Sequence, residues 1–459
     1  MGVIPIGGSG YDYGGRPKVT YAIILINVAV YLLTSYENSF IQTSEYWIEK
    51  AALMPVLLLE YGQWYRIITS MFLHADIFHI FFNMYFLYIF GKEVEKVLGS
   101  GKYFILYFAS GLAAIAFHTA FTPITGIYTV FIPALGASGA ISGVLGAYLL
   151  LFPNRRMSVC WFLWIIPWCF TTTAATFLIF WFAMQVLYGY ARLGSVAFFA
   201  HAGGFVMGLA ALLALKPRKE VLMRPIYFYP WTSYMTIYHY YEDYPDDYYG
   251  FGGEHYIIKR GLGGTSKTIL AILLVALMAG GFYSLLASQE MESGVYLYTI
   301  TAGYPGGEEK TDVAVYTLSQ GVVLSPVEDE PRIVLNRLDW AGLLTDDPNT
   351  VLEDYTFEGY IRTPFKGIRV SLELTANMEY DEYGVLIHSK GEMVTDVLQI
   401  VGTRVFIVKN QVFTFTIEAM GPVKDIDDKL IIPTVVPSIL ISLAALYAVS
   451  KKDTEIVIE

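Results

Sequence analysis

Long apolar runs constrain this chain more than any other feature of its sequence. A helix needs about 20 mostly apolar residues to cross the hydrocarbon core of a bilayer. Eight runs approach or exceed that length: 19–35, 75–91, 102–121, 138–153, 171–190, 197–215, 268–287 and 430–449. Only 15% of the 459 residues are charged, against about 25% in average soluble domains. The pattern predicts a polytopic membrane protein with six helices, an interruption and two further helices.

Basic residues between the runs predict the orientation of the helices, because short loops rich in Lys and Arg favour the cytoplasm. With the N-terminus inside, the basic clusters at 16–18, 92–102, 155–156, 216–219, 259–267 and 451–452 all fall on the cytoplasmic side. We therefore expect a multi-pass cell membrane protein with both termini in the cytoplasm. The first residues contain no early apolar core with a cleavage site, so a removable signal peptide is not expected.

The same reasoning divides the chain into seven parts. They are a cytoplasmic N-terminal tail (1–18), an all-α six-helix core (19–216), a tyrosine-rich cytoplasmic linker (217–266), a seventh helix (267–288), an extracellular mainly-β domain (289–429), an eighth helix (430–450) and a cytoplasmic tail (451–459). The linker is either loosely ordered or a surface for a partner.

Alternation with a period of two residues indicates that the extracellular segment is rich in strands. Val370, Leu372 and Leu374 alternate with polar residues, and the segment 413–417 repeats the pattern. Strands with one buried face have this period. We expect a small β-sandwich, which either recruits or filters substrates near an outward-opening site or is a separate surface module.

Composition excludes several functions. The formal net charge of −11 and the lack of a basic patch argue against nucleic-acid binding. Cys160 and Cys169 are too few for a disulfide framework or a zinc site. No HExxH motif and no pair of intramembrane aspartates is present, which disfavours metal-dependent and aspartyl proteases. We expect neither a metal nor a cofactor.

Polar side chains recur near the outer ends of the second, fourth and sixth runs. His79 and Asn83 share one helical face, Ser138 begins the fourth run, and His201 lies in the outer half of the sixth. Ionisable residues within a span are costly and indicate function by default. Since the three runs share one direction, these side chains are expected at a similar depth. His118, near the outer end of the third run, we interpret as interfacial.

Glycines explain how a serine and a histidine on separate helices could meet. The fourth and sixth runs carry small-xxx-small patterns, formed by Gly139, Gly143, Gly146, Gly204 and Gly208. Such patterns allow two membrane helices to pack closely. We therefore expect the serine of the fourth run to contact the histidine of the sixth.

These residue types suit nucleophilic catalysis. A serine attacks only when a base accepts its proton, and a neutral imidazole is a suitable base near neutral pH. Asn83, with or without His79, and the backbone N–H of Ser138 could stabilise an oxyanion. No acidic residue in the six runs is placed to complete a triad, so a Ser–His dyad is predicted. Ser142, one turn deeper than Ser138, is a rival nucleophile.

At this point the sequence resembles the rhomboid family of intramembrane serine proteases, over about residues 15–220. The family's G-x-S-G corresponds to 136–139, its H-x-x-x-N to 79–83 and its A-H-x-x-G-x-x-x-G to 200–208. The Trp64-Tyr65-Arg66 segment resembles the motif of the family's first loop, and Glu95 with Gly99 resembles the turn after its second helix.

The resemblance implies roles for individual residues. Ser138 is the nucleophile, His201 is the general base, and Asn83, His79 and the Ser138 amide form the oxyanion site. Supporting residues are His74, Gly136, Gly139, Gly204, Arg66 and Glu95. One departure is Ser142, which stands where the family often has an aromatic residue packed on the base.

The implied function is that of a serine endopeptidase that cleaves transmembrane segments of membrane proteins near the outer face of the bilayer. Its partners would be transmembrane protein substrates and the lipid bilayer, and the oligomeric state stays open. A first alternative is a catalytically silent rhomboid-like protein that binds transmembrane helices. A second is a transporter with a histidine proton relay, which predicts inverted repeats that we do not find in the sequence.

Overall fold

The computed structural model describes 3–6, 11–12, 16–60, 62–125, 130, 132–163, 166–193, 197–215, 224–225, 261–288, 294–318, 321–326, 328–364, 367–401, 404–421 and 427–451. Most of the tyrosine-rich linker and much of both tails lie outside the described residues. The expectations for those segments therefore stay predictions.

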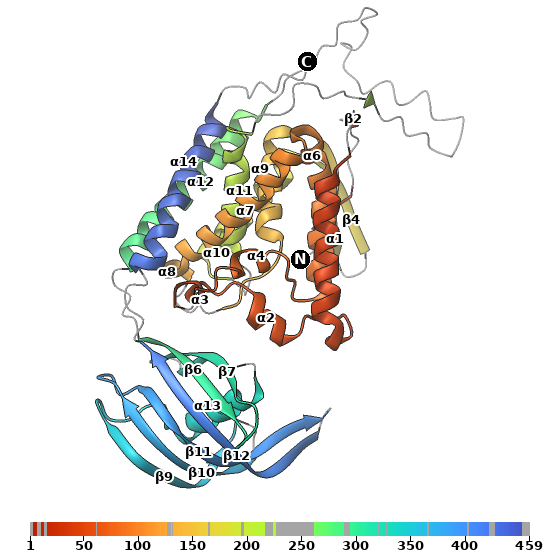
Figure 1. The fold of residues 1–459 in the computed structure, drawn as a ribbon. Helices are drawn as coiled ribbons and strands as arrows, with labels where there is room; N and C mark the ends of the chain where they lie inside the picture. Colours follow the sequence, from red (N-terminus) through yellow and green to blue (C-terminus); the bar gives the residue numbers. More distant parts are fainter. Residues whose placement is uncertain are drawn as a thin grey trace, which may run out of the picture.

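Helices dominate the first half of the chain (Figure 1). The principal helices are α1 (Lys18–Ser35), α5 (Ile77–Phe86), which continues through the π-helical turn η2 (Leu87–Gly91) into α6 (Lys92–Leu98), α7 (Ser100–Ala120), α9 (Ser138–Leu151), α10 (Ala174–Tyr190) and α11 (Phe198–Ala211). Short helices α2 (Glu45–Ala51), α3 (Pro55–Glu60) and α4 (Arg66–Thr69) occupy the first loop, and α8 (Thr122–Thr125) follows α7.

Two more helices follow, α12 (Gly264–Ser288) and, after the β domain and the π-helical turn η4 (Asp427–Ile431), α14 (Ile432–Ser450). Among the described residues, four helices are long and apolar enough to cross a membrane: Lys18–Asn38, Ser100–Ala120, Gly264–Ser288 and Lys429–Ser450. Three shorter apolar helices, α9, α10 and α11, complete the core. These seven helices correspond to seven of the eight predicted runs, whereas the second run, 75–91, forms the short helix α5 and the turn η2.

Helices α9 and α11 pack backbone against backbone. A Cβ atom at Gly204 would overlap the carbonyl oxygen of Gly139, and one at Gly208 would overlap that of Gly143. Likewise, a Cβ at Gly146 would overlap the backbone of Phe205. These contacts require glycine because the two backbones touch with no room for a side chain. The small-xxx-small patterns of the sequence therefore mark a real helix interface.

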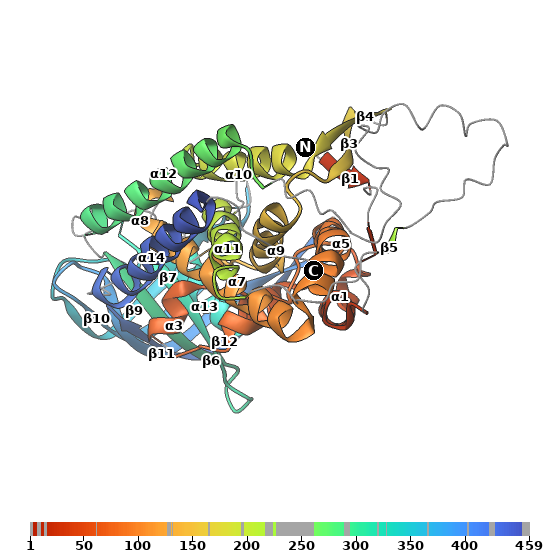
Figure 2. The ribbon, with the colours of Figure 1, turned by 90° about the horizontal axis from the view of Figure 1, so that it is seen from above.

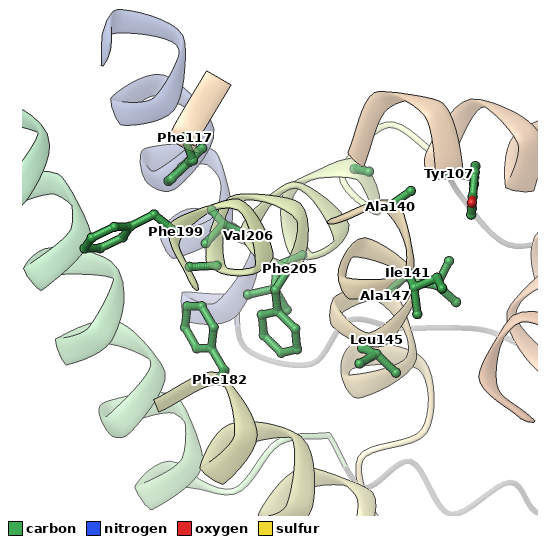
Figure 3. Packing of buried hydrophobic residues seen from close by; sticks show 14 of the residues in the cluster. Tyr107, Phe117, Ala140, Ile141, Leu145, Ala147, Phe182, Phe199, Phe205 and Val206 are labelled. Atoms are coloured by element: carbon green, nitrogen blue, oxygen red, sulfur yellow. The ribbon is translucent and has the colours of Figure 1, made fainter. Parts of the chain in front are cut away.

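Aromatic side chains fill the remaining space on the other side of α11. The ring of Phe182 on α10 stacks on that of Phe205 on α11, with centroids 4.5 Å apart (Figure 3). Near the first residue of α11, Phe199 stacks against Phe121, with centroids 4.2 Å apart. Seen from above, α10 and α12 lie along one side of the bundle, and α5 and α1 lie along the other (Figure 2).

The second half of the chain contains a β domain, but it is not the sandwich that we expected. Its strands are β6 (Val295–Gly303), β7 (Lys310–Thr317), β8 (Gly321–Leu324), β9 (Val351–Arg362), β10 (Arg369–Tyr380), β11 (Leu386–Val401) and β12 (Arg404–Met420). They form one antiparallel sheet in the order β8-β7-β6-β12-β11-β10-β9.

The helix α13 (Asp329–Ala341) covers the buried face of that sheet and gives a half-barrel instead of two packed sheets. Val334, Leu335 and Leu338 of α13 are fully buried among the alternating apolar residues of the strands. A period of two shows that a strand buries one face. It does not show whether a sheet or a helix covers that face, which is why the sandwich prediction was wrong.

A second correction concerns the cysteines. Between α9 and α10, β3 (Arg156–Leu163) and β4 (Ile166–Thr173) form an antiparallel hairpin, and β1 (Val3–Ile6) pairs with β3. Cys160 and Cys169 face each other across the hairpin and form a disulfide. Their count gave no sign of a pairing, because only the hairpin register places the two residues opposite each other.

The β domain contacts the helical core through the first loop. The Lys50 ammonium of α2 lies 3.5 Å from the buried carboxylate of Asp312 on β7. Val295, Leu297 and Val315 of the sheet belong to the same continuous apolar cluster as the helices. The domain lies at the end of the bundle where α2 and α3 lie (Figure 1).

We predict that Gly208→Ala destabilises the protein, because the added methyl group collides with the backbone of α9. Overpacking of this kind typically costs about 1–3 kcal/mol. The midpoint of thermal unfolding in detergent should fall by several degrees. Gly101→Ala is the matched control, since a Cβ there meets nothing within 4 Å. An unchanged midpoint for Gly208→Ala would contradict the close packing.

We also predict a pH effect at the contact between α2 and the β domain. Burial and the nearby carboxylates of Asp312 and Glu45 raise the pKa of Glu49 from 4.5 to about 7, outweighing the opposing effects of Lys50 and Arg332. The folded state thus binds more protons than the unfolded state between these values, and stability falls as the pH rises through this window.

Glu49→Gln removes the ionisable group while keeping the size of the side chain. The variant should unfold at a higher temperature than the wild type at pH 8, and the difference should vanish near pH 4. Glu37→Gln, at an exposed position in the same loop, provides the control. A Glu49→Gln gain that is equal at both pH values would count against this explanation.

Candidate functional site

Ser138 and His201 are in direct contact. The hydroxyl oxygen of Ser138, the first residue of α9, lies 2.8 Å from Nε2 of His201 on α11. The glycine interface between α9 and α11 brings the two helices close enough for this bond. The structure therefore joins the two residues as the motifs predict.

The turn before α9 fixes the position of the serine. Gly136 has a φ of 120°, a conformation that L-residues with side chains rarely adopt, and its N–H donates to the carbonyl of Ser70 at 2.8 Å. The next amide, that of Ala137, donates to Nε2 of His74 at 3.5 Å. Nδ1 of His74 in turn lies 3.3 Å from the carbonyl of Phe72. His74 thus supports the turn from the loop that precedes α5.

His79 lies beside this turn, and its contacts determine which ring nitrogen carries the proton. The carboxylate of Asp76 caps α5 by accepting the backbone N–H of His79 at 2.9 Å. Nδ1 of the His79 ring accepts the N–H of Ala75 at 3.4 Å. In a neutral ring the proton is then on Nε2. A Cβ on Gly136 would lie 2.8 Å from that Nε2 and 3.6 Å from Oγ of Ser138, so both groups are close to the same glycine.

Asn83 follows one turn later on α5 and is buried. Its Nδ2 donates to the carbonyl of His79 at 2.9 Å, which leaves a second N–H on the same amide. Asn83 and Ser138 line the same cavity. The predicted pair of donors on α5 is therefore present in the site.

Ser142 does not compete for the histidine. Its hydroxyl donates to the carbonyl of Ser138 at 2.6 Å within α9, and the residue is 1% exposed. The contacts that an aromatic residue at this position would make with His201 come instead from α10. Oε1 of Gln185 lies 2.9 Å from Nδ1 of His201, and the Trp181 ring lies with its centroid 6.2 Å from the imidazole.

Sequence reasoning missed Gln185. The available signal was a single amide in the middle of the apolar run FWFAMQVLYGY, since a polar residue inside a span needs a partner. His118 was also interpreted differently. It lines the cavity together with Ser138 and His201, with its Nε2 buried, which sequence reasoning did not foresee. Its place at the membrane interface stays a prediction.

The cavity that contains these groups has a volume of about 810 Å³. Its walls come from α5, α9, α10, α11 and the segments before α9 and α11, and they include Phe78, Phe82 and Phe86 of α5 and Trp181 and Tyr188 of α10. The volume is within the range of small-molecule and peptide side-chain sites. Mostly apolar walls with a few polar groups at one point suit an apolar peptide segment.

None of the six predicted supporting residues is among those that line the cavity, and two of them, Arg66 and Glu95, make their contacts in other parts of the core. Arg66 is buried, and its guanidinium donates to Gln63 at 2.6 Å and to the carbonyl of Ala52 at 2.7 Å, which ties the first loop together. The carboxylate of Glu95 accepts bonds from the start of α1, including the hydroxyl of Thr20 at 2.7 Å. Within the residues that the structure covers, no group of three or more potential ligands could hold a metal ion.

A helical membrane core with a buried serine–histidine contact, flanked by amide and imidazole donors, defines the class of protein. Residues 61–218 match the family model described as the rhomboid domain. Accordingly, the chain contains a rhomboid domain, and the resemblance seen in its motifs is confirmed over these residues.

Three similar proteins carry related names. The rhomboid protease GluP of Bacillus subtilis is 30% identical over 202 residues, covering 44% of this chain and 35% of that protein. Rhomboid protein 1, mitochondrial, of Saccharomyces cerevisiae is 31% identical over 199 residues, with coverage of 42% and 52%. Rhomboid-like protease 1 of Toxoplasma gondii is 27% identical over 228 residues, with coverage of 48% and 70%. The chain spans about a third to a half of the length of the first relatives it matches.

Proposed function

We propose that this protein is an intramembrane serine endopeptidase that cleaves transmembrane segments of membrane proteins by a Ser138–His201 dyad. The observation that carries the proposal is the 2.8 Å contact between Oγ of Ser138 and Nε2 of His201 inside an apolar cavity. Two relatives whose names include "protease" support the reaction class.

The proposed reaction begins when Ser138 Oγ attacks a peptide carbonyl while Nε2 of His201 accepts its proton. The oxyanion that forms is stabilised by the backbone N–H of Ser138, Nε2–H of His79 and the remaining N–H of Asn83. His201 then gives its proton to the leaving amine. Water hydrolyses the acyl-enzyme in a second attack, with His201 again as the base.

The geometry supports access from the side where the β domain lies. Leu53 of the first loop pairs with Ala134, just before the turn that holds Ser138. The same loop contacts the β domain through Lys50 and Asp312. We propose that this end faces the extracellular side, with both termini in the cytoplasm, and that substrates enter between α5 and α10.

The alternative is a catalytically silent rhomboid-like protein that binds transmembrane helices. Silent relatives lack the serine or the histidine, whereas this chain has both residues in hydrogen-bond contact. That contact favours the protease.

The dyad predicts the effect of three substitutions on cleavage of a model transmembrane substrate by purified protein in detergent. Ser138→Ala and His201→Ala should each abolish cleavage, because each removes a reacting group. Ser142→Ala should leave most of the activity, because the Ser142 hydroxyl is bonded within its own helix. A chelator should have no effect. Cleavage that survives in Ser138→Ala would overturn the assignment of the nucleophile.

We further propose that the half-barrel recruits or filters substrates at the mouth of the site. Its two ends are adjacent, since Leu297 of β6 pairs with Met420 of β12, so a short linker can replace residues 294–421. The shortened protein should fold but cleave a panel of transmembrane substrates with altered relative rates. Unchanged rates and unchanged preference across the panel would remove the recruiting role.

A further inference from the structure

The imidazole of a serine–histidine pair must be held in one orientation and in one tautomer. Position 142, four residues after the nucleophile, carries a serine whose hydroxyl bonds to its own helix. It therefore gives no contact that would orient His201. The partners of the ring are on α10 instead, where Gln185 and Trp181 are four residues apart and share one helical face.

The amide oxygen of Gln185 determines which nitrogen of His201 carries the proton. An amide Oε1 can only accept, so the 2.9 Å contact requires a hydrogen on Nδ1 of His201. In the neutral ring Nε2 is then unprotonated and faces the Ser138 hydroxyl at 2.8 Å. This is the tautomer that a general base for the serine needs.

We propose that Gln185 is a positioning residue that completes a chain of hydrogen bonds from Ser138 through His201 to Gln185. It acts through the histidine and does not touch the reacting atoms. The inference rests on the proposed protease function. No acidic residue of the six runs is placed to orient His201, and we assign that role to the neutral amide of Gln185.

The helix that carries Gln185 is itself held in place at two points. Phe182, three residues before Gln185, stacks on Phe205 of α11. Beyond Gln185, the Tyr190 hydroxyl donates to the carbonyl of Ala276 on α12 at 2.7 Å. Gln185 is 8% exposed, so its side chain has little freedom to leave the ring. The amide oxygen is therefore presented by a fixed helix, as positioning requires.

The test compares Gln185→Met with Gln185→Glu in the full-length protein. Methionine has nearly the same shape but lacks the acceptor oxygen, whereas glutamate retains one. We expect Gln185→Met to lower kcat by about 10- to 100-fold with KM within about twofold of the wild type. Gln185→Glu should recover most of that loss. Gln42→Met, at an exposed position of the first loop that does not line the cavity, is the matched control and should leave both constants unchanged.

A second measurement separates this inference from the proposed function. A fluorophosphonate phosphonylates an activated serine with loss of fluoride, so its rate of reaction reports on the pair without a peptide substrate. Wild-type protein that neither cleaves nor labels would overturn the proposed function itself. Wild-type protein that labels while Gln185→Met labels equally fast would overturn only the role of Gln185. So would a loss in Gln185→Met that Gln185→Glu shares in full, since that pattern indicates packing.

Discussion

The contact between the backbones of α9 and α11 is the constraint on which the rest of the site depends. Gly204 and Gly208 meet the backbone of Gly139 and Gly143, and Gly146 meets the backbone of Phe205, with no space for a side chain at these points. A glycine in a helix interior costs about 1 kcal/mol relative to alanine. That cost is offset here because a closer approach places a hydroxyl from one helix 2.8 Å from an imidazole on the other. A separation larger by one methyl group would break the bond.

Much of the site could be predicted because its residues follow a helical period. The spacing of His79 and Asn83, and the small-xxx-small patterns of the fourth and sixth runs, encode which faces meet. The structure places Ser138, His201, His79 and Asn83 around one cavity as these patterns imply. Such periodic features are local in the sequence, so they can be recognised without knowledge of the tertiary fold.

Contacts that depend on tertiary placement could not be predicted in the same way. Gln185 reaches His201 from a helix that shares no motif with α11, and its role is visible only when the two helices are packed. His118 faces the cavity because α7 presents that side to α11. The cysteine pair requires the register of a hairpin, and the half-barrel requires α13 to fold back over the sheet. Each missed feature joins segments whose sequences contain no common periodic pattern that would indicate the contact.

The rhomboid domain match covers 61–218, yet two walls of the cavity are connected to parts of the chain beyond it. On the α10 side, Tyr190 is bonded to α12, which leads directly into the first strand of the half-barrel. On the side of α5, the first loop contacts the same half-barrel through Lys50 and Asp312. The half-barrel thus contacts the first loop directly, and α12, the helix that precedes the half-barrel in the chain, contacts α10. Because Gln185 is on the helix that α12 contacts, the orientation of the imidazole and the placement of the appended domain depend on one continuous set of packed residues.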